Sequence, residues 1–247
     1  MNFPYQFDFF GSKVYYHFIL ETLAFFIGVR CYYYLKKKIQ DPIDSIDRLW
    51  ILLGAMLGAL LGSRAIAVLE IEHFWQLSFL EMYQNKTVAG GFLGGLLGVE
   101  LTKKCIGVKI ASGDIYVIPI IVALFIGRIG CFLMGTAEIT FGVETTFFMG
   151  MNLGDGKLRH PLALYEMGLM VVLLVLFLNL RNCKMQNGDL FKLFMVLYFL
   201  YRFLVEFIKP YNSILCGLSS IHWSCLFIFV YYWKFYCRIF KVEKKLH

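Results

Sequence analysis

Apolar runs of about twenty residues recur along this chain of 247 residues. A helix needs about 20 consecutive apolar residues to cross the hydrocarbon core of a bilayer. The runs cover residues 14–35, 49–69, 87–102, 115–134, 161–180, 190–208 and 216–237. Because the segments between them are too short for a soluble domain, the sequence predicts an all-α integral membrane protein. We expect about seven transmembrane helices in a single polytopic domain that spans residues 1–247.

The composition agrees with a membrane protein and argues against two other classes. Hydrophobic residues make up 59% of the chain, and charged residues only 17%, below the quarter that is typical of soluble domains. The net charge of +7 is not read as a nucleic-acid surface, because the basic residues lie in short clusters between the apolar runs. The seven cysteines have no metal-type spacing and mostly lie in or beside apolar runs. We therefore expect no nucleic-acid partner, no metal and no cofactor.

The distribution of Lys and Arg indicates how the chain is oriented, since cytoplasmic loops carry an excess of positive charge. With the N-terminus outside, 16 of the 24 basic residues fall on the cytoplasmic side, five fall outside and three lie within spans. The cytoplasmic set is Arg30, Lys36, Lys37, Lys38, Arg48, Lys103, Lys104, Lys109, Arg181, Lys184, Lys192, Lys234, Arg238, Lys241, Lys244 and Lys245. This predicts an external N-terminus, a cytoplasmic C-terminus, and outer segments near 70–86 and 135–160.

Glycines form stripes at four-residue spacing in the second and third spans. The stripes are Gly54, Gly58 and Gly62 in one span and Gly90, Gly94 and Gly98 in the other. Small residues at this spacing let helix backbones approach closely in lipid. Close packing is therefore expected of both stripes. Gly90 and Gly91 lie at the outer end of their span, where an opening between small residues could also admit a lipid headgroup.

Three arginines lie at membrane depth, namely Arg64, Arg128 and Arg202. An arginine at the centre of a transmembrane helix costs about 3 kcal/mol on insertion scales, so such residues are usually paired, hydrated or functional. All three fall toward the outer leaflet in the predicted topology. Guanidinium groups bind phosphate oxygens in a two-pronged geometry, so this pattern favours an anionic guest such as a phospholipid headgroup.

The sixth span places Tyr198, Arg202 and Glu206 on one helical face, because they are spaced four residues apart. Two interpretations stay open and are compatible. Arg202 and Glu206 could form an ion pair that stabilises the helix bundle. Alternatively, Tyr198 and Arg202 could line a polar cavity in which Glu206 orients the arginine.

The fifth span opens with the segment from Arg159 through His160 and Pro161 to Tyr165 and Glu166. His160 is placed at the membrane surface, where a general base could meet a lipid headgroup, although an interfacial histidine without a chemical role is equally compatible. Glu166 is most simply a counter-ion for a membrane arginine, and the same holds for Glu21. Near Arg128, Cys131 is either a small packing residue or a reactive thiol.

These blocks, taken together, resemble those of the prolipoprotein diacylglyceryl transferase family. They occur in family order and cover about residues 15–235. The blocks are Leu61-Gly62-Ser63-Arg64, Gly90-Gly91-Phe92-Leu93-Gly94-Gly95, Gly127-Arg128-Ile129-Gly130-Cys131-Phe132, Arg159-His160-Pro161 through Tyr165-Glu166, and Tyr198 through Arg202 to Phe207.

The resemblance implies a reaction at the outer face of the bacterial inner membrane. The family moves a diacylglyceryl group from phosphatidylglycerol to the thiol of a lipobox cysteine in the signal segment of a prolipoprotein, with release of glycerol phosphate. The positions that match imply catalytic roles for His160, Arg128, Arg202 and Tyr198. Substrate-binding roles are implied for Arg64, Gly90, Gly91, Arg159, Glu166 and Glu206.

Some positions depart from the family pattern. Members usually carry a histidine directly before the Gly-Gly of the third span, where this chain has Ala89. The asparagine that commonly follows Gly-Arg-Ile-Gly is Cys131, and the glutamate after it is Thr136. A general base contributes about 10²–10⁴ to a rate. The alternative is therefore a catalytically silent or specialised paralogue that binds lipid without transferring its diacylglyceryl group.

Overall fold

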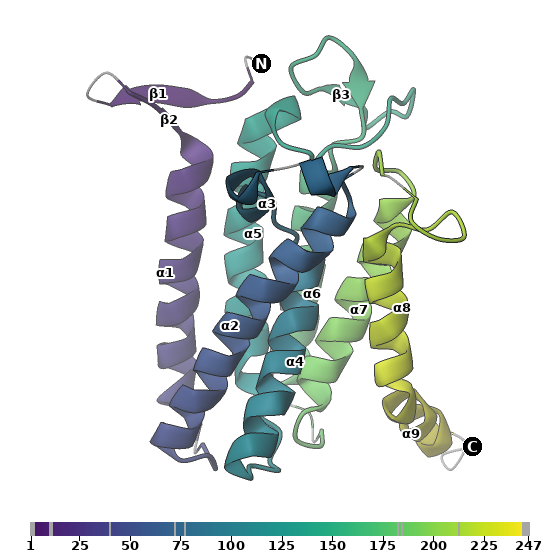
Figure 1. The fold of residues 1–247 in the computed structure, drawn as a ribbon. Helices are drawn as coiled ribbons and strands as arrows, with labels where there is room; N and C mark the ends of the chain where they lie inside the picture. Colours follow the sequence, from purple (N-terminus) through teal and green to yellow (C-terminus); the bar gives the residue numbers. More distant parts are fainter. Residues whose placement is uncertain are drawn as a thin grey trace. The chain divides into compact units, whose positions relative to one another are not determined.

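The computed structural model of this protein describes residues 3–9, 12–39, 41–71, 73–76, 78–181, 183, 185–211 and 213–243, with the side chains of residues 9, 12, 74 and 239–243 left out. Lys184, Lys244 and Lys245, which the charge count assigned to the cytoplasm, lie outside the described residues. Most of the described chain is α-helical (Figure 1).

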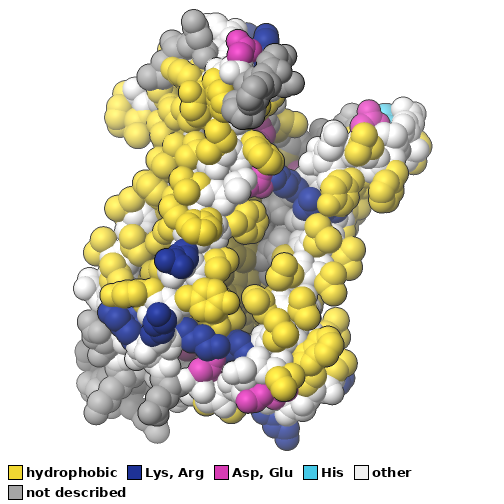
Figure 2. Space-filling model, turned by 90° about the vertical axis from the view of Figure 1, so that its left-hand side faces the viewer, with side chains coloured by type: hydrophobic (Ala, Val, Ile, Leu, Met, Phe, Trp, Pro, Cys, Tyr) yellow, Lys and Arg dark blue, Asp and Glu magenta, His cyan; other side chains and the backbone are white. Residues whose placement is uncertain are grey.

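Within the described residues, four helical stretches are long and apolar enough to cross a membrane. They are α1 (Tyr16–Lys36), α2 (Ser45–Leu69), the stretch Asp114–Ala137 that contains α5 (Val117–Met134), and α6 (Leu162–Leu180). Hydrophobic side chains cover much of the face in Figure 2, and Phe25 on α1 is 70% exposed. Such apolar exposure suits contact with lipid. The protein is therefore a multi-pass integral membrane protein.

Contacts divide the chain into two compact units. Unit 1 comprises Met1–Gln40, Gly113–Phe191 and Ile208–Pro210. Unit 2 comprises Asp41–Ser112, Lys192–Phe207 and Tyr211–His247. The single domain expected from the sequence stays a prediction.

In unit 1, α5 packs against both α1 and α6. Short β-structure accompanies these helices, which the all-α prediction omitted. Strands β1 (Gln6–Phe9) and β2 (Ser12–Tyr15) form an antiparallel hairpin, and β3 (Met151–Asn152) pairs with β4 (Leu158–Arg159). A four-residue strand gives too weak an alternating pattern to be recognised beside a 21-residue helix. Tyr5 donates its backbone N–H to the Leu133 carbonyl at 2.9 Å, which joins the N-terminal segment to the end of α5.

In unit 2, α2 packs closely against α4 (Val88–Ile106). The contact runs along the two glycine stripes, which we call the glycine seam. A Cβ atom added at Gly58 would lie 2.2 Å from the Gly94 carbonyl oxygen, and one at Gly98 would lie 2.1 Å from that of Gly54. The backbones therefore touch directly, and the close packing predicted from the stripes is confirmed.

Three predicted spans differ from the structure by a turn or more, and the second begins at Ser45 rather than at residue 49. The third continues for another turn to Ile106 and stops where Gly107 takes the left-handed conformation (φ 79°). The seventh is interrupted at Tyr232, which separates α8 (Ser220–Tyr231) from α9 (Trp233–Glu243). Its apolar run is continuous in sequence, so composition alone could not reveal the break. Unit 2 also contains the short helices η1 (Phe74–Gln76) and α3 (Phe79–Gln84).

The helix α7 (Asp189–Glu206) receives its N-terminal cap from a distant residue. Asp114, in η2 (Asp114–Tyr116), accepts hydrogen bonds from the backbone N–H groups of Gly188 at 2.6 Å and Phe191 at 2.9 Å. The first N–H groups of a helix have no partner within the helix, and a carboxylate there also complements the helix dipole. Asp114 therefore fixes where α7 begins in unit 1.

Candidate functional site

Arg128 lies on α5 with only 9% of its surface exposed. Its Nε is 2.9 Å from Oε1 of Glu166, which lies on α6 and is also buried. The ion pair therefore joins the two helices of unit 1, and it supplies the counter-ion that was expected of Glu166. One turn beyond Arg128, the Sγ of Cys131 lies 3.5 Å from its Nη1. The guanidinium group is thus held between a carboxylate and a thiol.

His160 lies two residues before the start of α6 at Leu162 and contacts the first turn of that helix. Its Nδ1 lies 3.0 Å from the hydroxyl of Tyr165, and its ring is half-buried. The backbone of His160 is also fixed, because Gly142 donates its N–H to the His160 carbonyl at 2.8 Å. A Cβ atom at Gly142 would lie 2.6 Å from Cβ of His160. The helix α6 therefore holds both groups in place with consecutive residues: Tyr165 contacts His160, and Glu166 pairs with Arg128.

Arg159 has acidic partners in the loop that precedes α6. Its Nε lies 2.6 Å from Oδ2 of Asp155, and its Nη2 lies 3.8 Å from Oε1 of Glu144. The guanidinium carbon also lies 5.0 Å from the ring centre of Phe141. The hydrogen bond from Arg159 lowers the pKa of the Asp155 carboxyl, helped by the backbone N–H of Lys157. Arg159 orders this loop through contacts that the sequence did not reveal.

In unit 2, Arg202 and Glu206 form an ion pair within α7. Nη2 of Arg202 donates to Oε2 of Glu206 at 3.1 Å, and the carboxylate is fully buried. Both side chains share one helical face, as the spacing predicted. This pair fixes the rotamers of its own helix, whereas the pair of Arg128 with Glu166 joins two helices.

Tyr198 is fully buried and packs in an aromatic cluster. Its ring stacks on Phe194 with centres 6.0 Å apart and meets the edge of Phe92 at 5.1 Å. Phe199 lies at 5.9 Å in a T-shaped contact. This arrangement gives Tyr198 a packing role in unit 2. The cavity-lining role suggested by the sequence stays a prediction.

Arg64 lies near the end of α2, where Nη1 donates to the Ser63 hydroxyl at 2.8 Å. Its guanidinium carbon lies 4.9 Å from the ring centre of Tyr83. Among the residues that the structure describes, Arg64 has no carboxylate partner, and its buried Nε has no hydrogen-bond partner. Arg64 therefore differs from Arg128 and Arg202, each of which is paired with a glutamate.

The two glycines at the start of α4 differ in their surroundings. A Cβ atom at Gly90 would lie 2.4 Å from the Gly62 carbonyl oxygen, whereas one at Gly91 would meet Cβ of Ser63 at an ordinary 3.7 Å. Gly90 is therefore required by the glycine seam, while Gly91 has room beside it. The preceding Ala89 is fully buried, so the position that carries a histidine in typical relatives holds a small apolar side chain here.

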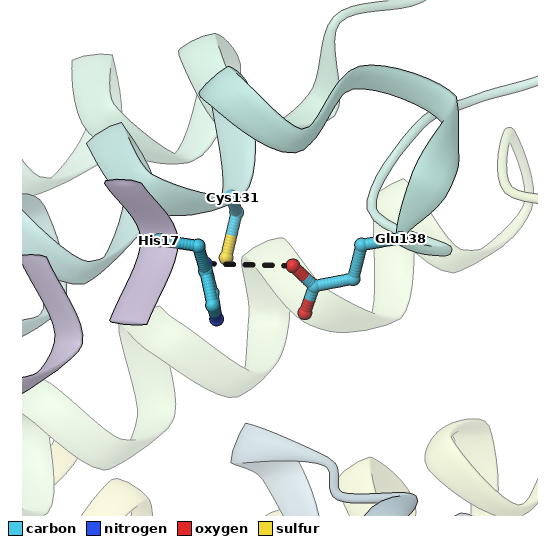
Figure 3. Close-up of side chains that lie close together, drawn as sticks. All are labelled: His17, Cys131 and Glu138. Atoms are coloured by element: carbon cyan, nitrogen blue, oxygen red, sulfur yellow. Dashed lines mark ion pairs between the residues drawn. The ribbon is translucent and has the colours of Figure 1, made fainter. Parts of the chain in front are cut away.

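The structure also brings together three side chains that sequence reasoning did not connect (Figure 3). His17 at the start of α1, Cys131 near the end of α5, and Glu138 after η3 (Gly135–Ala137) have ligand atoms within 4.8 Å of one another. They lie more than a hundred positions apart in the chain at the extremes. Because their spacing follows no local motif, the fold alone could reveal the group.

Comparisons with known proteins agree with the resemblance. Residues 4–237 match the family model described as prolipoprotein diacylglyceryl transferase. The chain is 32% identical over 239 residues to the phosphatidylglycerol–prolipoprotein diacylglyceryl transferase of Campylobacter curvus, with 87% of this chain and 86% of the relative covered. It is 30% identical over 222 residues to the protein of the same name from Ehrlichia ruminantium strain Welgevonden, with 82% of each covered.

Proposed function

Since this chain belongs to the prolipoprotein diacylglyceryl transferase family, we propose that it transfers a diacylglyceryl group from phosphatidylglycerol to a prolipoprotein cysteine. The thiol sulfur forms a bond to the terminal glyceryl carbon of the diacylglyceryl group, and the bond from that carbon to the phosphate oxygen breaks. Glycerol phosphate leaves with the bonding electrons. Two demands follow, because the leaving phosphate gains negative charge and the thiol must lose its proton.

The observation that carries the proposal is the buried guanidinium of Arg128. Glu166 fixes its Nε at 2.9 Å, so the charge is oriented before substrate arrives. Preorganised donors in a site that excludes water stabilise developing charge strongly. We assign Arg128 to the leaving phosphate, and Arg202 to a supporting role. Arg64, which lacks a carboxylate partner among the described residues, is assigned to the phosphodiester of the incoming lipid.

We assign the proton from the thiol to His160. Its imidazole lies at the start of α6, and the Tyr165 hydroxyl at 3.0 Å orients the ring. A base held in one orientation needs no reorganisation when its proton arrives. Tyr198, Gly90, Gly91 and Arg159 are supporting positions, whose contacts set the shape of their own helices and loop.

We further propose the finer topology of about seven membrane spans, with the N-terminus outside and the C-terminus in the cytoplasm of a bacterial inner membrane. The charge distribution supports this orientation. It places the loop with Asp155 outside and the loop with Lys109 inside. Alkaline phosphatase fused after Asp155 should then be active and, fused after Lys109, inactive. The reverse result would contradict the orientation.

The activity test uses purified protein, phosphatidylglycerol and a lipobox peptide, with the thioether product measured by mass spectrometry. Arg128→Ala should lower the rate by about 10²–10³-fold, the cost of losing one preorganised charge-stabilising donor. Arg30→Ala removes an exposed arginine of α1 and is the matched control, for which we expect an unchanged rate. Absence of product from the natural protein, beside an active relative assayed in parallel, would overturn the proposal.

The base is tested separately with His160→Asn. We expect a loss of about 10²–10⁴-fold, smaller at high pH, where hydroxide or bulk base removes the thiol proton. An unchanged pH profile would contradict the assignment of His160.

The second candidate is a paralogue that binds lipid without transfer. The observation that favours it is Ala89, whose buried methyl group offers no titratable side chain. Such a protein would retain phosphatidylglycerol but form no thioether, and Arg64→Ala would weaken retention without affecting any product. The assay with the lipobox peptide separates the two candidates.

A further inference from the structure

The group formed by His17, Cys131 and Glu138 has the composition of a zinc site. The ligand atoms of the three side chains lie within 4.8 Å of one another, and they approach from α1, from α5 and from the segment after η3 (Figure 3). Imidazole, thiolate and carboxylate are the ligands that Zn²⁺ takes in proteins, whereas Mg²⁺ and Ca²⁺ prefer oxygen alone.

The polar atoms at the centre of this group lack hydrogen bonds. His17 Nδ1 and Glu138 Oε2 are buried and have no hydrogen-bond partner among the described residues. They lie 3.6 Å apart, which is too far for a hydrogen bond. Two ligand atoms on a tetrahedral zinc lie about 3.3–3.8 Å apart, given zinc–ligand bonds of about 2.0–2.3 Å. The separation therefore fits two ligands of one ion better than it fits a hydrogen bond, and it is also within the distance of an ion pair with a protonated His17 (Figure 3).

The backbone around the group holds its members close together. Gly130 makes room for the histidine, because a Cβ atom there would lie 3.0 Å from His17 Nδ1. The hydrogen bond from Tyr5 to the carbonyl of Leu133 holds the segment before α1 against the end of α5. The other ring nitrogen of His17 lies 3.7 Å from the Glu21 carboxylate. A carboxylate behind a ligating histidine is the usual outer partner in zinc sites.

We propose that His17, Cys131 and Glu138 bind a Zn²⁺ ion or another thiophilic divalent cation. Thiolate and carboxylate together carry two negative charges, which neutralise the divalent ion in a largely buried place. The site would join the start of α1 to the end of α5. Three protein ligands leave a fourth tetrahedral position open, as in catalytic zinc sites.

The open position fits a thiol, and this step rests on the proposed function. A thiol that coordinates zinc is readily deprotonated, and its proton would pass to His160, the base assigned above. The acceptor cysteine of a prolipoprotein would reach the reaction as a metal-bound thiolate. The site lies one helical turn from Arg128, which we assign to the leaving phosphate.

The metal site is tested on the full-length protein in detergent, without any activity assay. After dialysis against a chelator, we expect one Zn²⁺ to rebind per chain. Co²⁺ should give the absorption band of a thiolate-to-cobalt charge transfer. The band should disappear in Cys131→Ser and persist in Cys225→Ser, which removes another buried cysteine. A folded protein with no bound zinc and no band, or an unchanged band in Cys131→Ser, would overturn the proposal.

Further variants test the other members of the site. His17→Gln and Glu138→Gln should each abolish stoichiometric zinc binding. Glu21→Gln should weaken it by about 10–100-fold, the usual effect of losing an outer partner. Zinc binding that survives both ligand variants would contradict the assignment. Circular dichroism and gel filtration confirm that each variant is folded.

The open position is tested by adding a lipobox peptide to the cobalt protein. A second thiolate ligand should intensify the charge-transfer band, whereas a peptide with serine in place of the cysteine should leave it unchanged. A band that does not respond to the cysteine peptide would overturn thiol binding and leave the metal site standing. Because none of these readouts requires thioether product, their failure is distinguishable from failure of the proposed transferase.

Discussion

The two units hold their helices together by different means. In unit 2, α2 and α4 meet along the glycine seam, where backbone contacts backbone. In unit 1, α5 and α6 are joined by the buried ion pair of Arg128 and Glu166. Lipid supplies little hydrophobic drive for helix association, so close packing and polar contacts must provide it. The glycine seam therefore leaves no room for added side-chain atoms, whereas the contact between α5 and α6 requires both members of the ion pair.

The largest effect is expected from adding volume to the glycine seam. A Cβ atom at Gly94 would lie 2.1 Å from the Gly58 carbonyl oxygen and 2.8 Å from Cα of Gly62. Because both neighbours are backbone, α2 and α4 would have to separate. We expect Gly94→Val to lower the free energy of unfolding by more than about 4 kcal/mol, a rare size for one substitution. Steric trapping in bicelles measures the change, and a loss below about 1 kcal/mol would contradict the backbone contact.

The next largest effect is expected from removing one partner of the buried ion pair. Glu166→Ala leaves the Arg128 charge without the carboxylate at its Nε, and such a change costs about 3–5 kcal/mol. The same measurement applies. The matched control is Glu144→Ala, which breaks exposed ion pairs with Lys157 and Arg159. Exposed pairs contribute about 0–1 kcal/mol to the free energy of unfolding. Equal losses of stability in Glu166→Ala and Glu144→Ala would therefore contradict a special role for the buried pair.

A double variant separates the stability of this pair from its chemistry. Replacing a buried ion pair by apolar residues of similar volume is often neutral or stabilising. Arg128→Met combined with Glu166→Met should therefore recover most of the stability that Glu166→Ala loses. Transfer activity should stay about 10²–10³-fold below that of the natural protein, since the guanidinium is gone. Recovered activity would show that the pair serves packing alone.

A smaller effect distinguishes the neighbouring glycines of α4. Gly90→Ala places a methyl group 2.4 Å from the Gly62 carbonyl oxygen, whereas Gly91→Ala meets only Cβ of Ser63 at 3.7 Å. Overpacking costs about 1–3 kcal/mol, and a substitution with room around it usually changes stability by less than about 0.5 kcal/mol. We therefore expect a measurable loss for Gly90→Ala only. A larger loss of stability for Gly91→Ala than for Gly90→Ala would show that α2 packs against the Gly91 face of α4.

The smallest effect concerns the exposed pair of Asp155 and Arg159. The hydrogen bond from Arg159 lowers the pKa of Asp155 in the folded protein. The contribution of this pair to folding stability is therefore fully present above the unfolded pKa of about 3.9. It is lost as the pH falls through the lower pKa of the folded protein. Carboxyl carbon NMR should report an Asp155 pKa below that of a free aspartate. Arg159→Gln should raise it toward the ordinary value, and no change would contradict the assigned cause.

The sequence predicts most of the helices because membrane spans need long apolar runs, and the glycine seam because its spacing matches the helical period. It also anticipates that Arg202 and Glu206 share a face, since they lie one turn apart. His160 and Tyr165 both lie in a recognised sequence block, but the sequence did not indicate that their side chains are in contact. The break at Tyr232 and the group of His17, Cys131 and Glu138 could not be predicted. The group depends on side chains that meet in space, which no period along the chain encodes.

The cap that Asp114 provides for α7 has a consequence for biosynthesis. Proteins are made from the N-terminus, and earlier segments fold first. When Gly188 and Phe191 leave the ribosome, Asp114 has already been synthesised, so the N–H groups at the start of α7 meet a waiting acceptor. A nascent chain that lacks this carboxylate would have to satisfy those groups with water during insertion. Loss of Asp114 should therefore slow the formation of α7 during insertion before it lowers the stability of the finished protein.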